Sequence, residues 1–263
     1  MRTTSTFSIL SLLLLGTACS DGTGPTGSGT ASLSLSLATS ALPSGSAAST
    51  AAGAETFTLG ATTIEFTSVQ VVLKSVKLVR ASSDDCESGD DEPSDDSCEA
   101  LRLGPQLFDV PLTAGAQRIL TVEVPADTYR RLKFHVHKPE NDGNTVDQAF
   151  LAANPSFEKV SIRAEGMFNG TPFTFETDLN AVQQIAFNPF LVVDAGGPVD
   201  LTMFLDLGAW FQDLSGTAFV NPLSALKGGQ NENLVEQNIK STIRVFRDDD
   251  QDGDDDEGDD DNS

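Results

Sequence analysis

Residues 160–177 read VSIRAEGMFNGTPFTFET, and this stretch is the clearest indication of the fold. The Asn-Gly pair at 169–170 lies between two apolar runs, a pattern typical of a β-hairpin with a two-residue type I′ turn. Such a turn would pair Gly166 with Phe173, so that a small residue on one strand faces an aromatic ring on the other. The stretch therefore predicts two antiparallel strands.

The same period-two alternation recurs on both sides of this hairpin. The other expected strands cover 33–37, 57–59, 64–79, 107–112, 118–124, 129–137, 199–207 and 242–246. Short helices are expected at 146–153 and 232–239, and a loop at 40–54. Strands dominate without βαβ alternation, so we expect an all-β fold over 31–247: an antiparallel β-sandwich with one or two short helices, followed by an acidic, disordered tail.

The N-terminus has the features of an export signal. Arg2 supplies positive charge, and the apolar run at 7–15 is far shorter than the ~20 residues that a membrane-spanning helix needs. Small residues at 16–18 (Gly-Thr-Ala) are suited to cleavage. Residues 1–18 are therefore expected to be a signal peptide.

Cys19 directly follows this signal. Residues 15–20 read LGTACS and resemble the lipobox of bacterial prolipoproteins, although Gly16 stands where that motif usually has Leu. The alternative is an ordinary secretory leader with a coincidental Cys. Acyl chains on Cys19 would anchor the protein to a membrane. By lipoprotein sorting rules, Ser20 favours the outer over the inner membrane of a cell that has both. Residues 19–30 would form a flexible tether.

The formal charge of −23 is concentrated in two segments. Nine acids lie between Asp84 and Glu99 and eleven between Asp248 and Asp261, with no Lys or Arg in either segment. The other 19 acids nearly balance the 16 basic residues. The sequence shows no basic footprint for a phosphate backbone, so no nucleic-acid partner is expected. Divalent cations or a cell-surface ligand are better candidates.

The acidic segment at 81–100 contains the other two cysteines, Cys86 and Cys98. An exported protein lies in a compartment that favours disulfides, and thiols in one hairpin-like loop can meet. A Cys86–Cys98 disulfide is therefore expected. A zinc site is the weaker alternative, because two ligands without a nearby His are too few.

The acidic tail at 248–263 begins like a calcium-binding loop. Asp248, Asp250 and Asp252 occupy positions one, three and five, Gly253 occupies position six, and Asp259 stands at position twelve. The apolar residue expected inside such a loop is missing. Weak, millimolar calcium binding is one interpretation; a solvated polyacidic tail is the other.

His135 and His137 are the only histidines and form a second candidate metal site. On a strand, residues i and i+2 lie on one face, so both rings could hold one ion, with Glu140 as a third ligand. The alternative is a solvent-facing strand surface that also carries Lys133.

Trp210 and Phe211 could form a sugar-stacking platform at a strand end or simply belong to the core edge. The chain contains no GxSxG, HExxH or glycine-rich phosphate motif. We therefore expect a non-catalytic protein with a structural or ligand-binding role. The alternative is a carbohydrate-active or hydrolytic envelope enzyme, which would need a cleft lined by two buried carboxylates.

Several strands resemble bacterial lipoproteins of the domain-of-unknown-function 4382 family. The matching stretches are 69–78, 124–129, 199–207 and 243–246, the second (VPADTY) being similar to the family's LPAGTY turn. The family's Asp-Ala-Pro after its first strand is absent, since 38–43 read ATSALP, and the acidic segment is an insertion. The resemblance implies a β-sandwich on a cell-envelope lipoprotein and no particular activity.

Overall fold

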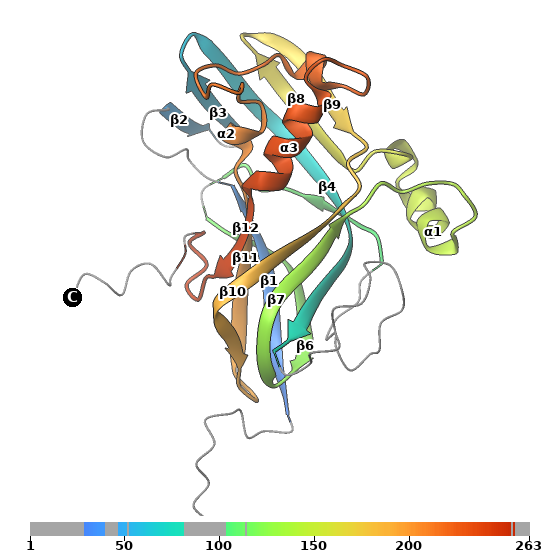
Figure 1. Ribbon diagram of the computed structural model, residues 1–263, viewed down its shortest axis with the longest axis vertical. Helices are drawn as coiled ribbons and strands as arrows, with labels where there is room; N and C mark the ends of the chain where they lie inside the picture. The colour runs from blue at the N-terminus through green and yellow to red at the C-terminus, as the bar shows by residue number, and fades with distance from the viewer. Residues whose placement is uncertain are drawn as a thin grey trace, which may run out of the picture.

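The computed structural model describes residues 29–39, 47–51, 53–81, 104–113, 115–253 and 255. These residues form two sheets with a shared apolar core, and the few helices are short (Figure 1). The all-β sandwich expected from the alternating pattern is confirmed.

The smaller sheet has four strands in the order β12-β11-β1-β6. They are β1 (Thr30–Thr39), β6 (Gln117–Pro125), β11 (Pro198–Leu205) and β12 (Ile243–Arg247). β1 and β11 run parallel, with Ser32 opposite Pro198 and Thr39 opposite Leu205, while the other pairs are antiparallel. This parallel pair is an exception within the expected antiparallel sandwich. Parallel neighbours need a long crossover connection, and here most of the larger sheet supplies it.

The outer face of the four-stranded sheet is largely closed to water. Leu33, Leu35 and Leu37 of β1 face the core as the alternation predicts, but Ser36 on the opposite face is also only 1 % exposed. Its neighbour on β11, Thr202, is equally buried. Burial on both faces is the usual environment of parallel strands, and it means that another part of the chain covers this face.

The larger sheet is built around one long strand, β4 (Thr62–Arg80). Its other strands are β2 (Ala47–Ala51), β3 (Ala54–Leu59), β5 (Gln106–Asp109), β7 (Asp127–Val136), β8 (Ile162–Phe168), β9 (Thr171–Thr177) and β10 (Ala181–Val193). The first half of β4 pairs with β3 and β8, and its second half with β5 and β7. The prediction of a loop at 40–54 is wrong at this point, because the strand β2 lies within that range.

The β8–β9 hairpin has the predicted register. Gly166 pairs with Phe173, and φ is 48° at Asn169 and 77° at Gly170, as a turn with two positive φ values requires. A Cβ atom on Gly166 would lie 1.7 Å from the carbonyl oxygen of Glu65 on β4. Only glycine therefore fits this position.

Three α-helices and two 3₁₀ helices complete the described fold. They are α1 (Thr145–Ala153), α2 (Leu207–Trp210), α3 (Glu232–Thr242), η1 (Pro155–Phe157) and η2 (Pro222–Ala225). α2 and α3 lie beside each other near β8 and β9, whereas α1 stands to one side (Figure 1). Val235 and Ile239 of α3 reach the core, and Asn238 donates a hydrogen bond to the carbonyl oxygen of Trp210 over 3.1 Å.

Candidate metal centre

Four of the predicted site residues lie outside the described part of the chain. They are Cys19, Cys86, Cys98 and Asp259. The lipidation, the disulfide and the twelfth position of the calcium loop therefore stay predictions. Among the described helices, none is long and apolar enough to cross a membrane.

The chain after β12 folds back over the outer face of the four-stranded sheet. The backbone N–H of Asp248 donates to the carbonyl oxygen of Asp200 on β11 (3.2 Å), and Ala116 before β6 donates to that of Gln251 (3.3 Å). Gly253 lies against Ala38 of β1, because a Cβ added there would be 3.4 Å from the Ala38 Cβ. Residues 248–253 are thus part of the fold, and the expectation that the whole tail is disordered is wrong for them.

This fold-back brings together the first three predicted calcium ligands. Carboxylate oxygens of Asp248, Asp250 and Asp252 all lie within 4.8 Å of one another. Asp250 and Asp252 are exposed to solvent, whereas Asp248 has no exposed surface. The backbone N–H of Asp252 donates to Asp250 Oδ1 over 3.3 Å, which helps to orient that carboxylate.

The two oxygens of Asp248 have different surroundings. Oδ2 accepts a 2.6 Å hydrogen bond from Thr202 Oγ1 and a 3.2 Å bond from the backbone N–H of Gly253. Oδ1 is buried and has no hydrogen-bond partner among the described residues. A buried carboxylate oxygen without a donor costs free energy unless a cation satisfies it. Three clustered carboxylate oxygens are hard ligands of the kind that calcium prefers.

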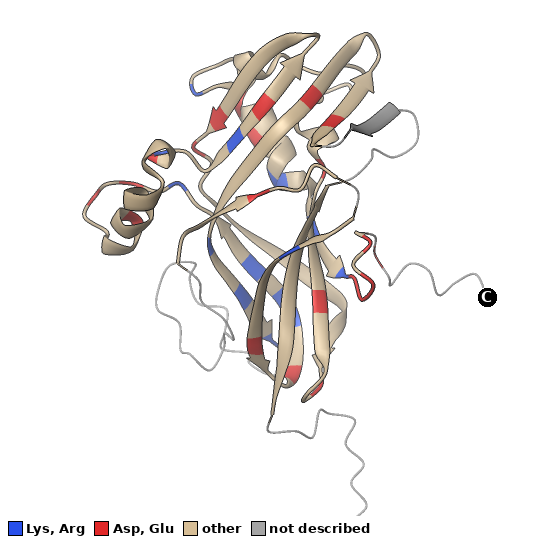
Figure 2. Cartoon of the chain, turned by 180° about the vertical axis from the view of Figure 1, so that it is seen from behind, with Lys and Arg blue, Asp and Glu red and all other residues tan. Residues whose placement is uncertain are grey.

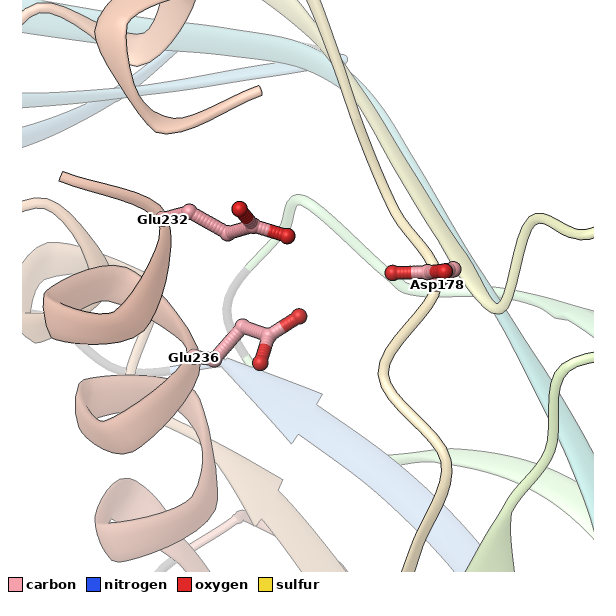
Figure 3. Close-up of side chains that lie close together, drawn as sticks. All are labelled: Asp178, Glu232 and Glu236. Carbon is pink, nitrogen blue, oxygen red and sulfur yellow. The ribbon is translucent and has the colours of Figure 1, made fainter. Parts of the chain in front are cut away.

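A second acidic cluster, which the sequence did not suggest, lies between α3 and the connection from β9 to β10. Asp178 faces Glu232 and Glu236 of α3 (Figure 3), again with carboxylate oxygens within 4.8 Å of one another. Spacing alone could not reveal the whole cluster, because Asp178 meets Glu232 and Glu236 only when α3 docks on the sheet. Their helical i, i+4 spacing was the one available signal.

The charges of this second cluster are already compensated by protein groups. Lys227 Nζ forms an ion pair and hydrogen bond with Asp178 Oδ2, and this contact lowers the pKa of the Asp178 carboxyl. Glu236 accepts from Thr177 Oγ1 (2.8 Å), and Glu232 accepts from the backbone N–H of Gly228 (2.7 Å). The α3 cluster therefore has no comparable need for a metal ion.

The two histidines are not placed as a metal pair. Their ring centroids are 5.3 Å apart, but His137 Nε2 lies 2.9 Å from Asp147 Oδ2 of α1. Neither histidine belongs to a group of three or more metal-type ligands among the described residues. His137 is only 6 % exposed, so the expectation of a solvent-facing ring is also wrong for it. Burial lowers its pKa, although the hydrogen bond to Asp147 opposes that effect.

Trp210 and Phe211 belong to the core. Both are fully buried, with the Phe66 ring 6.4 Å and 6.0 Å away respectively. A sugar-stacking platform needs an exposed ring face, so this interpretation is wrong. The pair is instead part of a cluster of edge-to-face aromatic contacts on the inner side of β8 and β9.

Glu55 of β3 is a buried acid that the sequence reasoning missed. It is 1 % exposed, and burial, with a smaller contribution from Asp206, raises its pKa to about 7. Burial also raises the pKa of Asp206. Glu55 shares the inward face of β3 with Phe57, and that alternation was the available signal. Neither acid lines the cavity of about 160 Å³ between β10 and β12 or that of about 550 Å³ beside α1.

Positive charge gathers on one face of the larger sheet. Lys77 of β4 pairs directly with Lys133 of β7, and Arg131 lies two residues from Lys133 on the same strand. Figure 2 shows Lys and Arg positions on neighbouring strands there, away from the acidic loop after β12. The net charge of −23 conceals this local basic face. The absence of a nucleic-acid partner stays a prediction.

Comparison with known proteins adds no relative. No protein-family model matches the chain, and no curated protein or solved structure matches it. The resemblance to the domain-of-unknown-function 4382 family therefore stays a prediction.

Proposed function

We propose that this protein is a non-catalytic, lipid-anchored protein of the bacterial cell envelope whose β-sandwich binds a calcium ion through Asp248, Asp250 and Asp252. Cys19 would carry the lipid, and residues 20–30 would separate the domain from the membrane. The ion would hold the C-terminal loop on the four-stranded sheet, which gives the site a structural or ligand-presenting role.

The observation that carries the calcium site is the unpartnered Oδ1 atom of Asp248. The residue is fully buried, yet this oxygen has no donor, while two further carboxylates lie within reach of the same ion. Asp250 and Asp252 keep open access to solvent, so an ion can enter and retain several water ligands. Calcium accepts six to eight oxygens in flexible geometry, which suits a loop that supplies only part of the shell.

The buried acids support a binding role over a hydrolytic one. A carboxylate-dependent hydrolase needs two acids that a substrate can reach. Glu55 is 1 % exposed, and neither of the two cavities named above is lined by Glu55 or Asp206. The raised pKa of Glu55 is accounted for mainly by its burial in the core.

Isothermal titration of calcium into the full-length chain in detergent tests the site. Binding with a dissociation constant of about 10⁻⁴ to 10⁻³ M is expected for the unaltered chain, as for extracellular calcium modules. Asp248→Asn should remove the part of the heat that comes from this site. Asp249→Asn is the matched control, because it removes the same charge from a neighbour whose carboxylate pairs with Arg247.

Any calcium bound by the acids between Asp84 and Glu99 contributes equally to all three proteins. Equal heats for the unaltered chain and Asp248→Asn, or no heat at all, would contradict the calcium site. Mass spectrometry of the mature protein tests the anchor separately. An acylated N-terminal Cys19 is expected, and an N-terminus at Met1 would refute it.

A further inference from the structure

The proposed cation site is bounded on one side by the four-stranded sheet. The spacing of its aspartates does not reveal this. Asp248 lies over Thr202 of β11, which donates to its Oδ2 atom over 2.6 Å. Ser36 of β1 is the direct pairing partner of Thr202 in the parallel ladder. Paired residues project from the same face of a sheet, so the Ser36 hydroxyl stands beside that of Thr202, under the loop.

Ser36 and Asp248 each contain a buried oxygen without a partner. Within the described part of the chain, the Ser36 hydroxyl and Asp248 Oδ1 both lack hydrogen bonds, and the two residues are 1 % and 0 % exposed. A serine hydroxyl can donate to a carboxylate directly, yet no hydrogen bond joins this pair. Ser36 pairs with Thr202 and Asp248 bonds to it, so these two buried oxygens would leave a place for a bridging water or a cation. The nearby carboxylates of Asp250 and Asp252 favour the cation.

Other polar groups on this face are directed elsewhere. Arg118 Nη2 of β6 donates to Asp200 Oδ1 over 3.2 Å, and Gln251 Nε2 donates to the same oxygen over 3.2 Å. The guanidinium of Arg118 is therefore held by Asp200 and does not satisfy Asp248. The hydroxyl of Thr202 is likewise used by the other carboxylate oxygen.

We propose that the Ser36 hydroxyl oxygen is a direct ligand of the cation held by Asp248, so that the ion is bound between the C-terminal loop and the first strand of the fold. This inference rests on the proposed calcium site and adds a ligand from a residue more than two hundred positions away in the chain. The hydroxyl is a neutral oxygen, which calcium accepts alongside carboxylates and water. The loop alone would then be an incomplete site.

Ser36→Ala in the full-length chain tests this ligand, with Ser34→Ala as the matched control. Ser34 lies on the same strand and face and is 5 % exposed, but it pairs with Asp200 rather than with Thr202. Ser36→Ala should weaken calcium binding about tenfold, in the range known for residues that support a metal site, while Ser34→Ala should bind as the unaltered chain does. Equal melting temperatures in EDTA would show that both variants fold.

Terbium luminescence gives a readout that a merely structural role would not change. Lifetimes of bound Tb³⁺ in H₂O and D₂O report the number of coordinated waters, and loss of a protein ligand should add about one water in Ser36→Ala only. Unchanged affinity and hydration in Ser36→Ala, or equal weakening in both serine variants, would overturn the role of Ser36. If Asp248→Asn still removes the heat that comes from this site in that case, the calcium site itself stands. Absence of calcium binding by the unaltered chain would refute both.

Discussion

Two clusters of three carboxylates occur among the residues that the structure describes, and they differ in how fully protein groups satisfy them. At α3, Asp178 has Lys227 as a counter-ion, and the two glutamates accept hydrogen bonds from protein donors. In the loop after β12, one oxygen of the fully buried Asp248 has no donor. Both clusters have three acids, but protein groups satisfy the carboxylates of the α3 cluster more fully than that of Asp248. The proposal of a metal site therefore depends on an unsatisfied buried oxygen and not on the number of acids.

Glu55 shows a third way of accommodating a buried acid. It has one buried oxygen without a partner, as Asp248 has, but its pKa is raised to about 7, and among the described residues it belongs to no cluster of three metal-type ligands. Protonation can therefore neutralise Glu55 near neutral pH, whereas Asp248 lies with two further carboxylates that a divalent cation could bridge. Lysine at Asp178, a proton at Glu55 and, in our proposal, calcium at Asp248 are thus three different partners for carboxylates in one domain.

The largest expected difference between the two clusters is their effect on the stability that the protein gains from calcium. At a calcium concentration about 100 times the dissociation constant, binding should raise the free energy of unfolding by about 2.7 kcal/mol. Urea denaturation in calcium and in EDTA measures this. Asp248→Asn should lose the increment, and Asp178→Asn should keep it. If Asp178→Asn lost it instead, the assignment of the ion to the loop after β12 would be reversed.

Glu55→Gln should stabilise the protein at alkaline pH. The folded-state pKa of about 7 lies above the ordinary value of 4.5, so the carboxyl's contribution is fully present below pH 4.5 and is lost as the pH rises through 7. A neutral amide avoids this loss, so the variant should gain about 1 to 3 kcal/mol at pH 8 and little at pH 4. Urea unfolding at both values measures it. A gain of equal size at both would show that ionisation is not the cause.

Lys227→Met should allow the α3 cluster to bind calcium, as we propose for the loop after β12. Removing the counter-ion of Asp178 leaves three carboxylates whose remaining cation, Lys138, is 3.9 Å from Asp178 and also pairs with Glu140. We expect titration calorimetry of this variant to show a second, weaker calcium-binding event. Lys240→Met, on the same helix as the glutamates, is the control. A titration identical to that of the unaltered chain would mean that lack of a counter-ion is not sufficient for binding.

Much of the fold could be predicted because it depends on local patterns. The Asn169-Gly170 turn and the inward face of Leu33, Leu35 and Leu37 follow from turn chemistry and period-two alternation, and both are confirmed. The parallel pairing of β1 with β11 could not be predicted, because alternation gives the faces of a strand and not its neighbours.

The residues of the candidate site likewise divide into those that a local pattern predicts and those that depend on long-range pairing. Asp248, Asp250 and Asp252 could be recognised from their spacing, which is local. Ser36 could not, because it comes under the loop only through the pairing of β1 with β11 and the return of the chain over that pair. For Trp210 the sequence left a sugar-stacking platform and a core position open, for a related reason. Its position after a strand was visible, but the Phe66 ring that covers it comes from β4.

The central position of β1 also affects how the domain would respond to mechanical load. Its hydrogen-bonded ladders run from Ser32 to Thr39 against β11 and from Thr30 to Leu37 against β6. If Cys19 is fixed in a membrane, a pull on the domain enters through Thr30 and acts along the strand. Both ladders are then loaded in shear, so many hydrogen bonds must break together rather than one after another. The strand next to the tether would resist extraction better than an edge strand peeled from one end.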